Sequence, residues 1–115
     1  MANKLKINRG TTYTIGITYQ RNGEAASLVG ATVRFTVKST EYSANTTDTD
    51  ALIVKNVTDG DALGQAAITI SPNDTATMLP NTYYYDIKVE EASGQIYKLD
   101  EGTVILDASP TNRLA

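Results

Sequence analysis

The sequence predicts an all-β fold, and three observations lead to that prediction. Apolar and polar residues alternate along most of the 115-residue chain, turn-forming residues interrupt the alternation about every ten positions, and no long helical pattern appears. Segment 82–90 shows the alternation best, with Tyr83, Tyr85, Ile87 and Val89 on one side. A strand buries such a face, whereas a helix would spread these residues around its whole surface.

Composition limits the chemistry that this chain can perform. The length fits a single compact domain over residues 1–115, and the chain contains no Cys, His or Trp. Disulfides, thiolate nucleophiles and the usual zinc sites are therefore excluded. Ten basic against thirteen acidic residues give a formal charge of -3, which repels a phosphate backbone, so we expect no nucleic-acid partner.

The amino-terminal residues predict where the protein is made. Residues 1–6 lack the apolar core of a secretory signal, and no later run is long enough to cross a membrane. We therefore expect synthesis in the cytoplasm without a signal peptide, and no membrane partner.

The first half of the chain predicts three strands, joined by turns. They lie at 5–7, 12–20 and 32–38, with turns at 8–10 and at 21–24. The second of these turns contains Asn22-Gly23, a pair that readily accepts positive φ angles. Segment 40–50 has almost nothing apolar to bury and predicts a long exposed loop.

The second half predicts strands at 51–57, 66–70 and 82–90, and a final strand that follows a hairpin turn at 92–95. Ser71, Pro72 and Asp74 form a helix-start pattern, and Pro80 limits that helix to one or two turns. In the final strand Tyr97 and Leu99 are odd-numbered, while the later apolar residues are even-numbered. One extra residue restores a common face, so we predict a β-bulge near 101–102, followed by a polar tail.

Together these elements predict an antiparallel immunoglobulin-like β-sandwich. Seven or eight short strands with hairpin turns are typical of two packed antiparallel sheets. The single helical turn near residues 72–79 fits the corner where the chain crosses between the sheets, and a tyrosine of 83–85 is expected to hydrogen-bond back to it. A small barrel is the alternative, since it shares the pattern.

No catalytic residue, metal ligand or cofactor site is predicted. The acidic pairs at 90–91 and 100–101 lie near hairpin turns and strand edges, where they are expected to be solvated charges. Asp48 and Asp50, like Asp59 and Asp61, lack the spaced acidic run of a calcium loop and are explained by turn chemistry.

Two tyrosines are candidate contact residues. Tyr84 is expected to face outward, where its ring could stack on a sugar or on a partner protein, although tyrosine is also a strong strand former. Tyr42 is the single large side chain in the polar loop 40–50, and exposed loop tyrosines are typical anchors of interfaces.

Four segments together resemble a group of small tailed-bacteriophage proteins. They are Leu5-Lys6-Ile7-Asn8-Arg9-Gly10-Thr11-Thr12-Tyr13, Leu28-Val29-Gly30-Ala31-Thr32-Val33-Arg34-Phe35, Leu79-Pro80-Asn81-Thr82-Tyr83-Tyr84-Tyr85-Asp86-Ile87 and Glu101-Gly102-Thr103-Val104. The chain is similar over nearly its whole length to the amino-terminal immunoglobulin-like domain of the siphophage baseplate upper protein. Thr11 replaces the Asp that this family tends to have, and Asn81 replaces a Gly. The resemblance therefore concerns the attachment module of the baseplate protein, and we expect no counterpart of its receptor-binding extension.

The resemblance implies a structural, non-enzymatic protein of the virion. It implies assembly or attachment in the tail, baseplate or neck, contacts with other virion structural proteins, and several copies or a homo-oligomer. The arms 1–4 and 108–115 would dock on neighbouring sheet edges. With Tyr42 and Tyr84, the candidate interface residues are Leu5, Arg113 and Leu114.

The sequence leaves other functions open. A protein decorating the outer surface of the head is one alternative, and a carbohydrate-binding or adhesion module is another. A glycan is therefore a possible ligand, though less favoured than a protein partner. A glycosidase would require two facing carboxylates.

Overall fold

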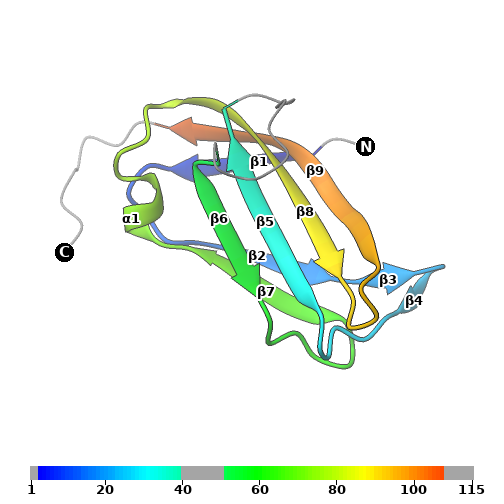
Figure 1. The fold of residues 1–115 in the computed structure, drawn as a ribbon. Helices are drawn as coiled ribbons and strands as arrows, with labels where there is room; N and C mark the ends of the chain where they lie inside the picture. Colours follow the sequence, from blue (N-terminus) through cyan, green and yellow to red (C-terminus); the bar gives the residue numbers. More distant parts are fainter. Residues whose placement is uncertain (1–2, 40–50, 108–115) are drawn as a thin grey trace.

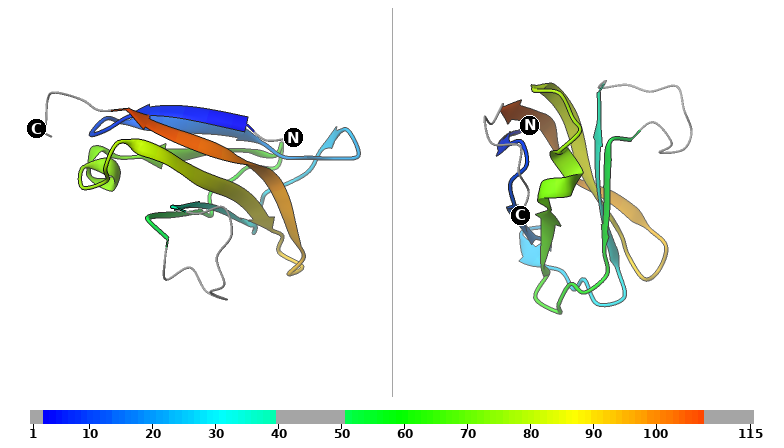
Figure 2. Two further views of the ribbon diagram at one scale, coloured as in Figure 1. Left: turned by 90° about the horizontal axis from the view of Figure 1, so that it is seen from above. Right: turned by 90° about the vertical axis from the view of Figure 1, so that its left-hand side faces the viewer.

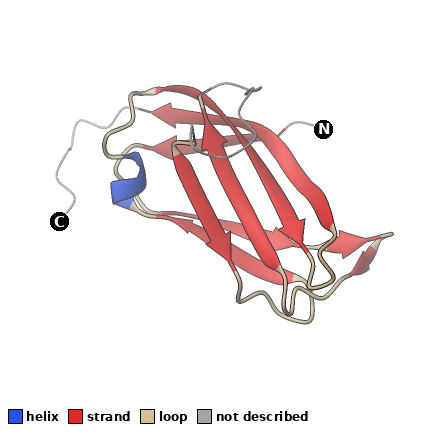
Figure 3. Ribbon diagram, in the orientation of Figure 1, coloured by secondary structure: helices blue, strands red, loops and turns tan. Residues whose placement is uncertain are grey.

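The computed structural model describes residues 3–39 and 51–107, and regular structure in them is nearly all strand (Figure 1, Figure 3). The described residues form β1 (Asn3–Asn8), β2 (Tyr13–Thr18), β3 (Gln20–Arg21), β4 (Glu24–Ala25), β5 (Thr32–Lys38), β6 (Ile53–Val57), β7 (Gln65–Ile70), α1 (Pro72–Thr75), β8 (Asn81–Glu90) and β9 (Ile96–Asp107). These are nine strands, against the seven or eight predicted. The extra strands come from β3 and β4, a short hairpin that forms its own two-stranded sheet.

The strands form two packed layers, so the predicted immunoglobulin-like sandwich is confirmed (Figure 2). One layer is a five-stranded sheet in the order β1-β9-β8-β5-β6, and the other is the pair β2-β7. In immunoglobulin terms β9, β8, β5 and β6 correspond to strands G, F, C and C′, and β2 and β7 correspond to B and E.

One strand pair differs from the predicted antiparallel arrangement. β1 pairs with β9 in parallel, in a register that joins Asn3 to Gly102 and Asn8 to Asp107. The remaining pairs among the described strands are antiparallel. Parallel pairing is possible because almost the whole chain lies between the two strands, whereas a tight hairpin would require antiparallel strands.

The core consists of the inward side chains that the alternation predicted. In β8, Tyr83, Tyr85, Ile87 and Val89 are buried, and their outward neighbours are half-buried or exposed. The other strands contribute their own inward residues. The fully buried large side chains are Phe35, Ile7, Leu28, Ile68, Ile70, Ile87, Leu106, Val33, Val37, Val89, Val104 and Thr75.

The helical turn α1 begins as its sequence predicted. Pro72 occupies the first turn, and the backbone N–H of Ser71 donates to Asp74 Oδ2 at 2.7 Å. Lys55 of β6 lies 2.8 Å from the same oxygen and ties the large sheet to this corner. Burial alone would raise the pKa of Asp74, but the hydrogen bonds from Lys55 and Ser71 and the lysine charge outweigh it and lower this pKa.

Arg9, at the end of β1, holds the same corner from the other side. Its Nε donates to the Met78 carbonyl at 3.0 Å, and its terminal nitrogen donates to the Ala76 carbonyl. The N–H of Gly10 donates to the hydroxyl of buried Thr75 at 2.8 Å. Carbonyls that follow a helical turn lack partners within the turn, and here a guanidinium satisfies two of them.

Tyr83 forms the hydrogen bond back to the corner that was expected of the tyrosine triplet. Its O–H donates to the Leu79 carbonyl at 2.5 Å, an arrangement known from immunoglobulin-like domains as a tyrosine corner. Two residues later, the Tyr85 ring contacts Phe35 of β5, with centroids 5.8 Å apart and planes inclined by 39°. This aromatic contact lies where many immunoglobulin domains have a cystine packed against a tryptophan.

The predicted bulge exists, but its predicted position was wrong. The β8–β9 register steps from Ile87 opposite Asp100 to Lys88 opposite Lys98, so Leu99 is the extra residue. Gly102 instead lies in the regular ladder opposite Tyr85. The odd-to-even change had shown that one extra residue exists, but it could not fix the position.

Replacing Tyr83 with Phe should destabilise the fold by about 1–2 kcal/mol, because the ring stays buried while the Leu79 carbonyl loses its donor. Urea unfolding measures the change. Tyr84→Phe removes a hydroxyl from the neighbouring residue, for which no hydrogen bond is found within the described structure, and should change stability by less than about 0.5 kcal/mol. Equal effects of the two substitutions would contradict a stabilising role for the Tyr83 hydrogen bond.

Candidate interaction surface

The structure describes two of the five candidate contact residues. Tyr84 lies on the central strand β8 and is half-buried. Leu5 lies on β1, where it is partly buried and packs against the core. Tyr42, Arg113 and Leu114 lie outside the described residues.

Tyr84 lies on the face of the five-stranded sheet that points away from the β2–β7 layer. We call this the outer face. Lys38 of β5 and Thr103 of β9 lie directly opposite it, and Lys4 of β1 lies beyond Thr103 in the same row. These neighbours explain why the tyrosine is half-buried although it points outward. Its ring is flanked by side chains of the adjacent strands and does not stand free.

Ion pairs neutralise much of the charge on the outer face. Arg34 Nη2 lies 3.0 Å from Glu90, and Lys98 Nζ lies 3.6 Å from Glu101. Two exposed apolar residues, Val54 (46% exposed) and Ile96 (59%), lie on β6 and β9, with β5 and β8 between them. The outer face therefore presents mixed charges and separated apolar side chains, with no continuous apolar patch among these residues.

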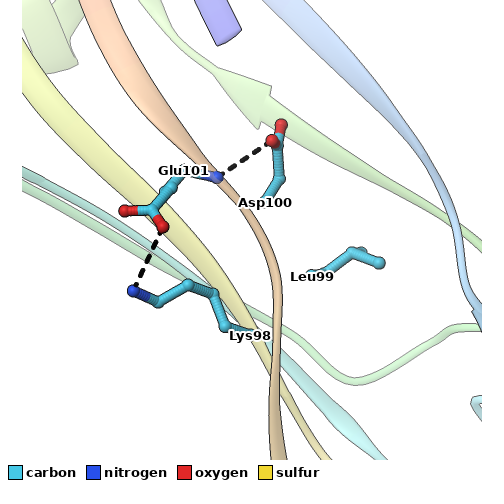
Figure 4. Close-up of a pocket in the computed structure, with 4 residues that line it drawn as sticks. All are labelled: Lys98, Leu99, Asp100 and Glu101. Carbon is cyan, nitrogen blue, oxygen red and sulfur yellow. Dashed lines mark hydrogen bonds and ion pairs between the residues drawn. The ribbon is translucent and has the colours of Figure 1, made fainter. Parts of the chain in front are cut away.

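A small open hollow of about 170 Å³ lies beside the bulge and is lined by Lys98, Leu99, Asp100 and Glu101. Figure 4 shows that Leu99 and Asp100 project from one side of β9, while Lys98 and Glu101 project from the other. Two successive residues on one side are what a bulge produces. Asp100 accepts hydrogen bonds from the Tyr85 hydroxyl at 2.9 Å and from the Glu101 N–H at 2.9 Å. The two carboxyl groups diverge, so they do not face each other across a cleft.

A second polar group, which we call the hairpin cluster, joins the β3–β4 hairpin to the β8–β9 hairpin. Its members are Tyr19, Arg21, Glu91, Gln95 and Tyr97. The Tyr19 hydroxyl donates to Glu91 Oε2 at 2.7 Å, and Arg21 Nη1 lies 3.1 Å from the same oxygen. The Arg21 guanidinium also lies over the Tyr97 ring, 4.7 Å from its centroid, and donates to its hydroxyl at 3.2 Å.

Sequence reasoning did not predict the hairpin cluster. Arg21 and Glu91 are about seventy positions apart, and no local pattern indicates that the two hairpins meet. The adjacent acids at 90–91 were expected to be solvated, whereas Glu91 is bonded to a buried tyrosine and to an arginine. A useful signal was Tyr19 itself, since a buried tyrosine hydroxyl normally requires a partner.

Comparisons with known proteins found a likeness to solved structures. No family model matches the chain, and no curated protein matches it. The chain is similar to a solved structure of murine CRIg, at 12% sequence identity and a TM-score of 0.39, with 92% of each chain covered.

Residues 3–39 and 51–107 offer neither a cluster of metal ligands nor a membrane-spanning helix. No group of three or more acidic side chains in these ranges is placed to hold a metal ion. None of the described helical structure is long and apolar enough to span a membrane.

Tyr19 should make the stability of the fold depend on alkaline pH. Burial, followed by the hydrogen bond and charge of Glu91, raises the pKa of its hydroxyl from 10.0 to about 12. A raised pKa in the folded state gives stability that is complete below pH 10 and is lost as the pH rises from about 10 to about 12.

Urea unfolding at increasing pH measures this loss. Tyr19→Phe should lower the unfolding free energy near neutral pH and make its alkaline decline shallower than that of the parent chain. Tyr84→Phe serves as the control and should keep the parent slope. Identical slopes for the parent chain and Tyr19→Phe would contradict the assignment.

Proposed function

We propose that this chain is a structural, non-enzymatic component of a tailed-bacteriophage particle that acts through protein–protein contacts. Attachment or assembly in the tail, baseplate or neck fits its sequence resemblance best, and decoration of the outer head surface is the second possibility. Its partners would be other virion proteins and further copies of itself.

The observation that carries the proposal is how the polar side chains of the sandwich are used. Asp74 and Arg9 fix the α1 corner, and the hairpin cluster fixes the opposite end. Asp100 is bonded to Tyr85. Within residues 3–39 and 51–107 these groups brace strands and hairpins, and the two carboxyl groups beside the open hollow point apart, which favours a rigid building block over a reaction centre.

The segments that carry the family resemblance have structural roles in this fold. Gly10 and Gly30 have positive φ angles of 77° and 78° in tight turns. Leu79 supplies the carbonyl of the tyrosine corner, and Gly102 pairs with Tyr85 in the β8–β9 ladder. The likeness to the baseplate domain therefore concerns residues that define a scaffold, as expected for proteins that share an assembly module.

The proposal is tested on purified particles from the host culture in which the protein is produced. Mass spectrometry should find the protein in particles purified on a density gradient, and gold-labelled antibody should mark one fixed position on each particle by electron microscopy. Recovery of the protein only from the particle-free fraction would overturn the proposal.

The carboxy-terminal arm gives a second test. Deleting residues 108–115 leaves every described strand intact, because β9 ends at Asp107. We expect this truncated chain to fold with unchanged thermal stability but to enter particles several-fold less often than the parent chain.

Point substitutions separate the sequence of the arm from its length. Arg113→Ser with Leu114→Ser should reproduce most of the incorporation defect, whereas Thr111→Ser with Asn112→Ser should not. Normal incorporation of the truncated chain would exclude a contact by this arm.

A further inference from the structure

The two-stranded sheet exposes a strand edge that the rest of the described fold leaves unpaired. β2 bonds to β7 along one side, and no described strand pairs with its other side. Immunoglobulin-like sandwiches commonly place four strands in the corresponding sheet, with two further strands flanking this central pair. β2 is therefore a central strand of the usual arrangement that lies at an edge here.

The hydrogen-bond phase shows which groups point out of this edge. The N–H of Tyr19 donates to the Gly64 carbonyl at 2.7 Å, so the residues of β2 that bond to β7 are the odd-numbered ones. Thr14, Gly16 and Thr18 consequently direct their backbone N–H and C=O groups away from β7. All three residues are exposed.

The opposite edge of the pair is partly closed. On β7 the groups that point away from β2 belong to Gln65, Ala67 and Thr69. The N–H of Gln65 already donates to the Asp61 side chain at 2.9 Å, and its carbonyl accepts from the Asp61 N–H at 3.0 Å. The β2 edge is thus the more accessible of the two.

β2 lacks the features that usually prevent edge strands from pairing. Its six residues, Tyr-Thr-Ile-Gly-Ile-Thr, include no charge and no proline, and its pairing with β7 has no bulge. Natural edge strands are normally protected by charged side chains, prolines or bulges. An unprotected edge of this length can accept another strand.

The sequence of this strand indicates which partner fits. Residues 13–19 read Tyr-Thr-Ile-Gly-Ile-Thr-Tyr, which is the same in both directions about Gly16. An antiparallel neighbour of identical sequence would place Thr14 opposite Thr18, Ile15 opposite Ile17, and each Gly16 opposite the other. Threonine pairs and β-branched pairs are favourable across strands.

We propose that two copies of this chain pair through β2 about a two-fold axis at Gly16, which joins their two-stranded sheets into one four-stranded sheet. The hydrogen-bonding pattern of β2 agrees with this arrangement. Thr14, Gly16 and Thr18, whose backbone groups point away from β7, would form hydrogen-bonded pairs with their counterparts in the second copy. That gives about six backbone hydrogen bonds, two for each pair. Ile15 and Tyr13, which are half-buried at the open edge, would gain cover from the second copy.

This proposal does not depend on the particle to which the protein belongs. Sedimentation equilibrium of the full chain, from low micromolar to low millimolar concentration, should show a reversible dimer. A chain that stays monomeric over this range would overturn the proposal.

Charge substitutions test the register. Thr14 and Thr18 are exposed and face each other across the proposed axis, so T14K/T18K places like charges opposite in both pairs and should weaken the dimer roughly tenfold. The matched variant T14K/T18E places opposite charges there and should keep the parent affinity. Equal weakening by both variants, or by neither, would contradict this interface.

Mixing two variants of opposite charge distinguishes a weakened interface from a folding defect. T14K/T18K and T14E/T18E should each dimerise weakly alone and form a mixed dimer when combined. Failure to form the mixed dimer, while circular dichroism shows both variants folded, would contradict the register.

A disulfide test locates the axis directly, since the chain has no cysteine of its own. A Cβ at Gly16 would meet no atom within 4 Å, and paired residues at the axis have Cα atoms about 5.5 Å apart, so Gly16→Cys should cross-link on mild oxidation. The control Ala67→Cys lies opposite Gly16 on β7. It would be about 14 Å from its counterpart across three strand spacings and should not cross-link. The reverse result would overturn the proposal.

Discussion

The pairing of β8 with both of its neighbours is the interaction on which the rest of the sandwich depends. β8 bonds to β5 on one side and to β9 on the other, so β6 and β1 are attached to the sheet only through these partners. Its inward residues form the centre of the core, where Tyr85 contacts Phe35. Tyr83, on the same strand, fixes the corner through the Leu79 carbonyl. One strand therefore determines both the register of the large sheet and the position of the crossing to the other layer.

Much of this fold could be predicted from the sequence, because strand period and turn chemistry are local properties. The inward set of β8, the positive φ at Asn22, the start of α1 and the tyrosine corner all depend on residues within a few positions of one another. The parallel pairing of β1 could not be predicted, since its partner is about a hundred residues away. At the bulge the Asp100 carboxylate accepts a hydrogen bond from Tyr85 of the neighbouring strand β8, a contact that the alternation of residues does not show.

The candidate surface was predicted less completely, for a related reason. The strand phase correctly places Tyr84 on the outer face, but its half-burial comes from Lys38 and Thr103 on other strands. Arg21 and Glu91 meet only because two hairpins lie at the same end of the sandwich. The palindrome about Gly16 is visible in the sequence itself. The palindrome indicates a pairing surface only because β2 lies at an open sheet edge. The same residues between two neighbouring strands would have no free backbone groups.

The parallel β1–β9 pair has a consequence for how the protein is made. Its register joins residues 3–8 to 102–107, so β9 is synthesised about a hundred residues after β1. Contacts between such distant positions form late, because a long loop must close before they provide any stabilisation. During translation the hairpins and the β5–β8 pair can form first, while β1 remains unpaired. Completion of the large sheet therefore has to wait for the synthesis of β9, and the nascent chain exposes the inner side of β1 until then.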